Sequence, residues 1–249
     1  MKNFPEESAQ LAALETFDPA AFQGSGEVPQ DLCNFVLALA LIYNDCKDII
    51  YARLVLGESQ PPAPPRKDRL WGAWAGVDFH IFRALVGALH ELFNLVRDNE
   101  PAITHPFMRA VIQQLPQPAR QGWDAVTAVA LGATPGDPLG KRLLLIRNKV
   151  ASHYDAKAIL AGYNYHFFGA DRQDDRAFIS RGASMRSTWF YFADAAVTGY
   201  LRSIVGKDES QEILVMNIAE LLRPVNRALM RIVETFVQRR GYAYRTAME

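Results

Sequence analysis

The sequence predicts an all-α protein, a helical bundle carrying an extra aromatic loop or short hairpin and additional C-terminal helices. Apolar residues recur at three- and four-residue steps through several long segments, which is the spacing of one face of a helix. Prolines at 61–65, 101–106 and 135–138 separate these segments. The 249 residues are 49% apolar and 22% charged, a composition typical of a globular chain rather than a disordered one.

The N-terminal part of the chain is predicted to differ from the rest. Residues 1–30 are weakly patterned and rich in Ala, Pro, Gly and acidic residues, so we expect a flexible arm there. The helical pattern starts at Asp31, a residue type that caps helix N-termini. Four prolines within 61–65 end this first helix and form a stiff connector. The remainder, residues 31–249, is predicted to be a single helical domain.

A second long helix is predicted from about residue 68 to residue 99. Its apolar stripe is broad enough for a central helix of a bundle, and Pro101 ends it. Further helices are predicted at about 105–115, 117–131, 138–156, 186–205 and 208–240. We expect a kink in the last of these at Pro224.

Residues 162–185 have a different pattern. An aromatic segment precedes a charged run, 171–176, which is followed by Ala177-Phe178-Ile179. This order favours a small β-hairpin, and a long ordered loop is the alternative.

The two cysteines, Cys33 and Cys46, are thirteen residues apart on one predicted helix. At about 1.5 Å of rise per residue they would lie roughly 20 Å apart, too far for a disulfide within the chain. No secretory pattern is found at the N-terminus, and the longest apolar stretch, 35–43, is about half the length of a membrane span. We therefore expect a soluble cytoplasmic protein without a membrane partner.

Known metal and phosphate motifs are incomplete in this chain. His90-Glu91 begins like a zinc-protease helix, but Asn94 stands where the second histidine ligand is needed. A phosphate-binding loop ending at Lys141 would need a glycine at Pro135. We therefore expect no metal and no cofactor, although a three-histidine metal site assembled from separate helices is an alternative.

The balance of charged residues limits which kinds of nucleic-acid binding are expected. Basic and acidic residues balance at 27 each, which argues against tracking of a long nucleic-acid backbone but not against a local cationic site. Basic residues concentrate at 141–149. On an ideal helix Arg142, Lys149 and His153 share one stripe, whereas Arg147 lies about 120° from His153. Arg147 and His153 converge only if the helix bends or ends nearby, or if two copies of the chain pair.

This stripe suits a phosphodiester, because a guanidinium clamps phosphate oxygens and an imidazole moves a proton near neutral pH. The segment Arg147-Asn148-Lys149-Val150-Ala151-Ser152-His153 resembles the Arg-x(4–6)-His motif of the HEPN superfamily, in the form found in HEPN-like proteins of the abortive-infection type. The resemblance implies an up-and-down helical bundle that forms a homodimer, with both motifs facing one cleft. For active members it also implies metal-independent RNA cleavage.

The resemblance assigns roles to residues of this chain. Arg147 would hold the phosphate, and His153 would assist attack by the RNA 2′-hydroxyl. Candidate substrate-binding residues are Asn148, Lys149, Arg142 and Tyr154, and candidate supporting residues on another helix are Asn44 and Asp45. A toxin or phage-defence role, with a cognate antitoxin as partner, is the corresponding biological prediction.

Four of these residues also have a purely structural interpretation. Arg147 would pair with Asp155, His153 would cap a helix end, and Asn44 and Asp45 would form a solvent face. The alternative function is then a non-catalytic interaction or nucleotide-binding module of the same fold.

Further polar and aromatic residues outside the motif are given expected positions in the fold. Asp78 and His80 are expected in the core or in a polar cleft beside Trp71 and Trp74. His105 and His166 are expected on the surface or in loops. Tyr163, Arg181 and Arg186 are expected to extend a nucleic-acid-binding surface. The apolar stripe of the last helix is expected in the core or in a dimer contact.

Overall fold

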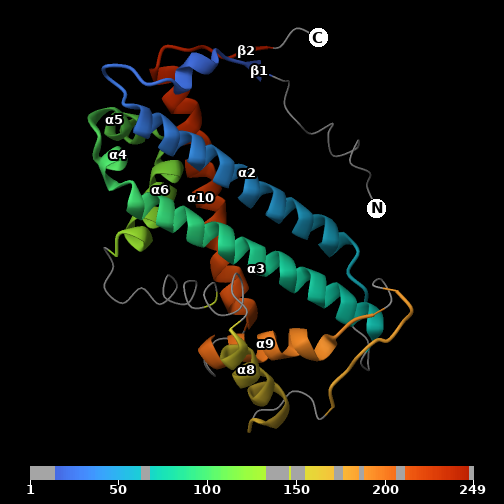
Figure 1. Ribbon diagram of the computed structural model, residues 1–249. Helices are drawn as coiled ribbons and strands as arrows, with labels where there is room; N and C mark the ends of the chain where they lie inside the picture. Colours follow the sequence, from blue (N-terminus) through green and yellow to red (C-terminus); the bar gives the residue numbers. More distant parts are fainter. Residues whose placement is uncertain are drawn as a thin grey trace. The chain divides into compact units, whose positions relative to one another are not determined.

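The all-α prediction is confirmed. The computed structural model describes residues 15–62, 68–132, 146, 155–170, 176–184, 188–205 and 211–246, and these residues are predominantly helical (Figure 1). The helices are η1 (Pro19–Phe22), α2 (Gln30–Glu58), α3 (Arg69–Asp98), α4 (Glu100–Thr104), α5 (Pro106–Gln114), α6 (Gln117–Ala130), α8 (Ala156–Phe168), α9 (Tyr191–Val205) and α10 (Gln211–Arg239). Their bounds follow the apolar periodicity and the prolines between segments.

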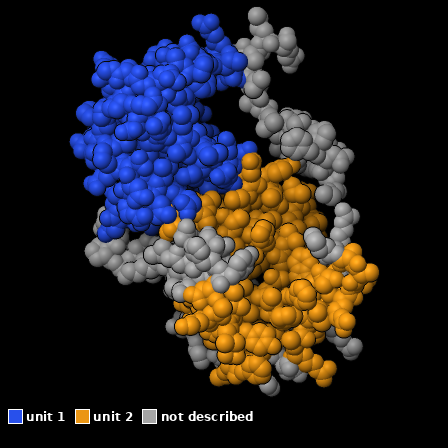
Figure 2. All heavy atoms as spheres, viewed as in Figure 1, with its two compact units in different colours: residues 1–47, 91–135, 221–249 blue, residues 48–90, 136–220 orange. Residues whose placement is uncertain are grey.

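The chain divides into two compact units. The first unit comprises residues 1–47, 91–135 and 221–249, and the second comprises residues 48–90 and 136–220 (Figure 2). Helices α2, α3 and α10 contribute residues to both units.

The first unit has a core formed by α2, α6 and α10. Phe35 of α2 meets Trp123 of α6 edge to face, with ring centroids 6.5 Å apart. Gly122 lets α6 approach the carbonyl of Pro224 in α10 so closely that a Cβ at this position would overlap it. Pro224 lies inside α10, which continues on both sides of it.

Residues 15–29 pack within the first unit, which differs from the flexible arm expected there. Phe22 stacks on Phe236 of α10 at a centroid distance of 5.6 Å, and Val28 is buried. Arg240 donates from Nη2 to the carbonyl of Gln23 at 2.6 Å. Glu15–Thr16 (β1) pairs antiparallel with Arg245–Thr246 (β2), with Glu15 opposite Thr246. Long-range contacts, rather than local pattern, order this segment.

The second unit contains α8, a helix that the sequence analysis missed. Residues 162–168 were expected in a loop or hairpin, but they form the second half of α8. Asp155 caps this helix, its Oδ1 accepting from the backbone N–H groups of Lys157 and Ala158 at 3.0 Å each. The prediction of a hairpin or loop was therefore wrong for this part of the chain, because a capped helix outweighs the strand preference of its aromatic residues.

Helices α8 and α9 of the second unit are in backbone contact. A Cβ at Gly162 would overlap the carbonyl of Ala196, and one at Gly199 would overlap the carbonyl of Gly162. The glycines thus allow the two helices to approach more closely than larger side chains would permit. Before α9, Ser180 and Trp189 exchange two backbone hydrogen bonds of 2.9 Å in a single antiparallel bridge.

Among the described residues, α3 alone has the length and apolar content that a membrane-crossing helix needs. Half of its most apolar window is buried inside the protein. Leu89, Leu92 and Val96 are fully buried there, so a core position accounts for the same composition.

Candidate functional site

The motif that carries the predicted chemistry lies outside the part of the chain that the structure describes. This holds for the candidate catalytic residues Arg147 and His153 and for Arg142, Asn148, Lys149 and Tyr154. Two neighbours of the motif are described: Ile146 is helical and buried, and Asp155 begins α8 as its N-cap. The shared Arg147–His153 site therefore stays a prediction.

The candidate supporting residues Asn44 and Asp45 are described on α2. Both are exposed, next to the buried Cys46. Their exposure agrees with the alternative in which they form the solvent face of α2. Their proposed contact with the motif stays a prediction.

A pocket of about 700 Å³ lies in the second unit. Its lining comes from the first turns of α3, the end of α8, the start of α9 and residues 178–181. This volume lies in the range of sites that enclose small organic molecules. We call it the aromatic pocket, because aromatic side chains come from all four of these segments.

The wall formed by α3 consists largely of two indole rings. Trp71 and Trp74 lie with their ring centroids 5.5 Å apart and their planes tilted by 36°. Phe79 continues this wall one turn further along the helix and is buried. Phe167 of α8 and Tyr191 of α9 supply rings from the other elements. Such rings provide apolar area and faces of negative potential.

Two glycines of α3 allow Trp189 and the first residue of α9, Tyr191, to pack closely against α3. An added Cβ at Gly72 would lie 2.5 Å from the ring of Tyr191, and one at Gly76 would lie 2.6 Å from the ring of Trp189. Both glycines line the pocket. The absence of side chains at these two positions therefore makes room for Tyr191 and Trp189 against the helix backbone.

Asp194 is the carboxylate of α9 that lines the pocket. Its Oδ2 accepts a hydrogen bond of 2.9 Å from Nε1 of Trp189, and it would lie 2.9 Å from a Cβ at Gly76. Asp194 is half-buried, and within the described residues no arginine, lysine or histidine forms an ion pair with it. A neutral indole thus supports this negative charge without neutralising it.

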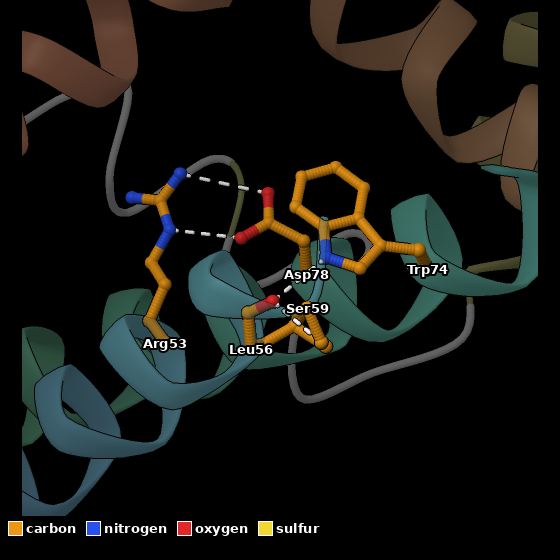
Figure 3. A network of polar contacts seen from close by, with 5 residues as sticks. All are labelled: Arg53, Leu56, Ser59, Trp74 and Asp78. Carbon is orange, nitrogen blue, oxygen red and sulfur yellow. Dashed lines mark hydrogen bonds and ion pairs between the residues drawn. The ribbon is translucent and has the colours of Figure 1, made fainter. Parts of the chain in front are cut away.

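Three carboxylates among the described residues line the pocket, the other two being Asp68 and Asp78, and Asp78 of α3 is already paired. Arg53 of α2 donates from Nε to Oδ1 at 2.9 Å and from Nη2 to Oδ2 at 3.5 Å, as Figure 3 shows. Beside this pair, Trp74 donates from Nε1 to the carbonyl of Leu56 at 3.0 Å. Ser59 donates to the same carbonyl at 2.8 Å. These bonds hold the end of α2 and the start of α3 together and fix the Trp74 ring.

The histidines are only partly where the sequence analysis expected them. His166 was expected on the surface or in a loop, but it is 6% exposed on α8 and lines the aromatic pocket, so that prediction was wrong. His80 is exposed and lies 3.3 Å from Arg83, outside the core or cleft expected for it. His105 caps α5 by accepting from the N–H of Phe107.

The residues expected to extend a nucleic-acid surface have separate positions. Arg181 is exposed and lines the aromatic pocket, whereas Tyr163 packs on Phe167 at a centroid distance of 4.7 Å. Arg186 lies outside the described residues. No sequence motif predicts the aromatic pocket as such. The only local sign of the pocket in the sequence is that Trp71 and Trp74 alternate with two glycines, Gly72 and Gly76, which lie about one helix turn apart.

Within the described ranges, the side chains of His, Cys, Asp and Glu form no group of three suited to a metal ion. The carboxylates and histidine of the aromatic pocket are thus spread among aromatic rings rather than gathered around one point.

Comparisons of the chain with protein-family models, with curated proteins and with solved structures gave no match.

Proposed function

We propose that this protein is a HEPN-like, metal-independent endoribonuclease that acts as a homodimer in the cytoplasm. The observation that carries the proposal is the segment Arg147-Asn148-Lys149-Val150-Ala151-Ser152-His153 within a predominantly helical chain. A toxin or phage-defence role with an antitoxin partner follows from the same proposal.

The proposed reaction uses the two charged ends of this segment. Arg147 holds the phosphate oxygens, and His153 accepts the proton of the RNA 2′-hydroxyl as its oxygen attacks phosphorus. The bond from phosphorus to the 5′-oxygen breaks, and that oxygen takes up a proton. The products are a 2′,3′-cyclic phosphate and a 5′-hydroxyl end.

In this proposal the two motif residues meet through pairing of two copies. On one straight, uninterrupted ideal helix the side chains of Arg147 and His153 diverge by about 120°, so such a helix in a single copy does not bring them onto one phosphate. Pairing of two chains brings the arginine of one motif close to the histidine of the other. Asn148, Lys149, Arg142 and Tyr154 then contact the RNA around the cleaved bond.

The direct test is cleavage of a mixed RNA pool by the purified full-length protein in the presence of a metal chelator. We expect wild-type protein to cut RNA. His153→Ala should lose at least about 100-fold in rate, as removal of a general acid–base group does, and Arg147→Ala should lose about as much, because a fixed cation at the phosphate stabilises the charge that develops there. Matched controls are Arg109→Ala and His80→Ala, since both residues are exposed and lie outside the motif. The enzyme proposal would be contradicted if wild-type protein left the RNA uncut, or if the motif variants cut it at the wild-type rate.

A second candidate is a non-catalytic binding module of the same fold. The aromatic pocket favours it, because a concave and largely apolar site with a few polar groups is typical of ligand sites. Ligand binding by a protein that leaves RNA uncut would support this second candidate over the first.

A further inference from the structure

The aromatic pocket has the chemistry of a binding site for one class of small molecule. We propose that it binds a planar aromatic organic cation, with the ring between the aromatic walls and the cationic nitrogen facing Asp194. This site is separate from the Arg147–His153 motif and does not depend on RNA cleavage. The aromatic pocket supports the second candidate function, and this inference names the class of ligand that the pocket would bind.

Planarity is inferred from the walls of the pocket. Trp71 and Trp74 of α3 and Tyr191 of α9 bring aromatic rings, each with two flat faces, into the lining from two helices, and the two indoles contact each other with centroids 5.5 Å apart. Offset stacking between such faces favours a flat ring over a bulky aliphatic group. Trp74 and Tyr191 are also held in place, because their polar atoms donate 3.0 Å hydrogen bonds to the carbonyls of Leu56 and Arg69.

Positive charge is inferred from Asp194. Partial burial of a charged carboxylate beside aromatic rings is unfavourable unless a cation or several hydrogen-bond donors replace the water it loses. Among the described residues its only hydrogen-bond donor is the neutral indole of Trp189, at 2.9 Å. As far as the chain is described, the lining has two other carboxylates. Asp78 already has Arg53 as its cation, and Asp68 is exposed and accepts from the backbone N–H of Leu70 at 2.6 Å. A ligand cation at Asp194 would gain both the carboxylate and the faces of the tryptophans.

The entrance to the pocket is open to water at Arg69 and Arg181, both exposed and both in the lining. His166 and Phe167, in contrast, are each 6% exposed. The pocket therefore has an accessible side and an enclosed side, and a ligand can enter without local unfolding. The arginines at the entrance also disfavour a second positive charge there, so the preferred ligand is a monocation.

Two probes of the same shape test this inference. Proflavine is a planar tricyclic cation at neutral pH, and acridine is a tricycle of nearly the same outline that is largely neutral there. Binding to the full-length protein, freed of nucleic acid, is measured by fluorescence titration at physiological salt. We expect proflavine to bind roughly tenfold or more tightly than acridine, because a charge-assisted contact is worth that much.

The variant that tests the role of the carboxylate is Asp194→Asn. An asparagine oxygen can still accept from Trp189, so we expect this variant to fold, as checked by its helical circular dichroism and melting midpoint. We expect it to bind proflavine about ten- to a hundredfold more weakly and to bind acridine unchanged. The matched control is Asp124→Asn, which removes an exposed carboxylate of α6 and should leave both probes unaffected.

A variant of the wall provides a measurement that does not depend on the folding of Asp194→Asn. Trp71→Ala removes one face from a half-buried position of α3 and should weaken both probes, since both need the stacked ring. Any one of three results would overturn the proposal. These are equal affinity for proflavine and acridine, proflavine binding that Asp194→Asn leaves unchanged, and no binding of either probe. RNA cleavage measured on the same variants should stay at the wild-type level, so failure of this inference and failure of the enzyme proposal are distinguishable.

Discussion

Trp189 and Asp194 are joined by a 2.9 Å hydrogen bond, and both side chains lie against the helix backbone at Gly76. This contact links the segment before α9 to α3, more than a hundred residues earlier in the chain. It also positions the carboxylate that we assign to ligand binding. The account therefore predicts that small changes at this contact affect both stability and binding.

Gly76→Ala tests the contact on the side of α3. The new Cβ would lie 2.6 Å from the ring of Trp189 and 2.9 Å from Oδ2 of Asp194, so these side chains must move. We expect a loss of about 1–3 kcal/mol in the free energy of unfolding, measured by urea denaturation. Gly57→Ala is the control, because no atom lies within 4 Å of its added Cβ, and we expect it to be neutral or stabilising by about 0.5 kcal/mol.

Gly162→Ala tests the close approach of α8 and α9. The added methyl group would overlap the backbone carbonyl of Ala196, which no rotamer change can relieve. We expect a destabilisation of about 3 kcal/mol. Ala161→Ser, at an exposed position of the same helix, should cost no more than about 0.5 kcal/mol. Equal melting midpoints for the two variants would show that the helices do not pack as described.

The thiol of Cys46 should be unreactive in the folded protein. Burial, together with the smaller effect of the neighbouring carboxylate of Asp45, raises its pKa to about 12. Since the thiolate is the reactive form, we expect no reaction with a disulfide reagent near neutral pH until the protein is unfolded. Fast labelling of Cys46 in the native protein, located by mass spectrometry of its peptides, would contradict the burial of this residue.

The same shift predicts how stability depends on pH. In the unfolded chain the thiol ionises near its ordinary pKa of 9.0, whereas in the folded protein it keeps its proton up to a pKa of about 12. The unfolded state therefore binds fewer protons in this window, and the contribution of Cys46 to stability falls as the pH rises from about 9 to about 12. We expect the free energy of unfolding of wild type to fall more steeply in that window than that of Cys46→Ala. Parallel slopes would argue against the shift.

The Arg53–Asp78 pair should contribute modestly to stability. Its side chains are 34% and 25% exposed, so solvent screens part of the attraction. A double-mutant cycle with Arg53→Ala and Asp78→Ala should give a coupling of about 0.5–1 kcal/mol that decreases at high salt. The more exposed Arg231–Glu234 pair of α10 is the comparison, and we expect its coupling to be smaller.

The helices that the sequence predicted well are those with strong local signals. Apolar periodicity and flanking prolines place α3, α5 and α6 within a residue or two of their observed bounds. The start of α8 also had a local signal, since Asp155 precedes a run of helix-forming residues. The aromatic residues at 163–168 favoured a strand and obscured this signal.

The features that the sequence did not predict depend on contacts between distant residues. Residues 15–29 are ordered by Phe236 and Arg240, more than two hundred residues away. The aromatic pocket likewise arises where Gly76 of α3 meets Asp194 of α9. Local patterning carries no information about such pairs, so the pocket becomes visible only in the folded chain.

The central claim is that Arg147 and His153 cleave RNA without a metal ion, and the end groups of the RNA products test it most directly. The account predicts that wild-type protein, in the presence of a chelator, leaves 2′,3′-cyclic phosphate and 5′-hydroxyl ends. It also predicts that these ends are absent with Arg147→Ala or His153→Ala. Intact RNA with wild-type protein, cleavage that requires a divalent cation, or the same ends from both variants would contradict it.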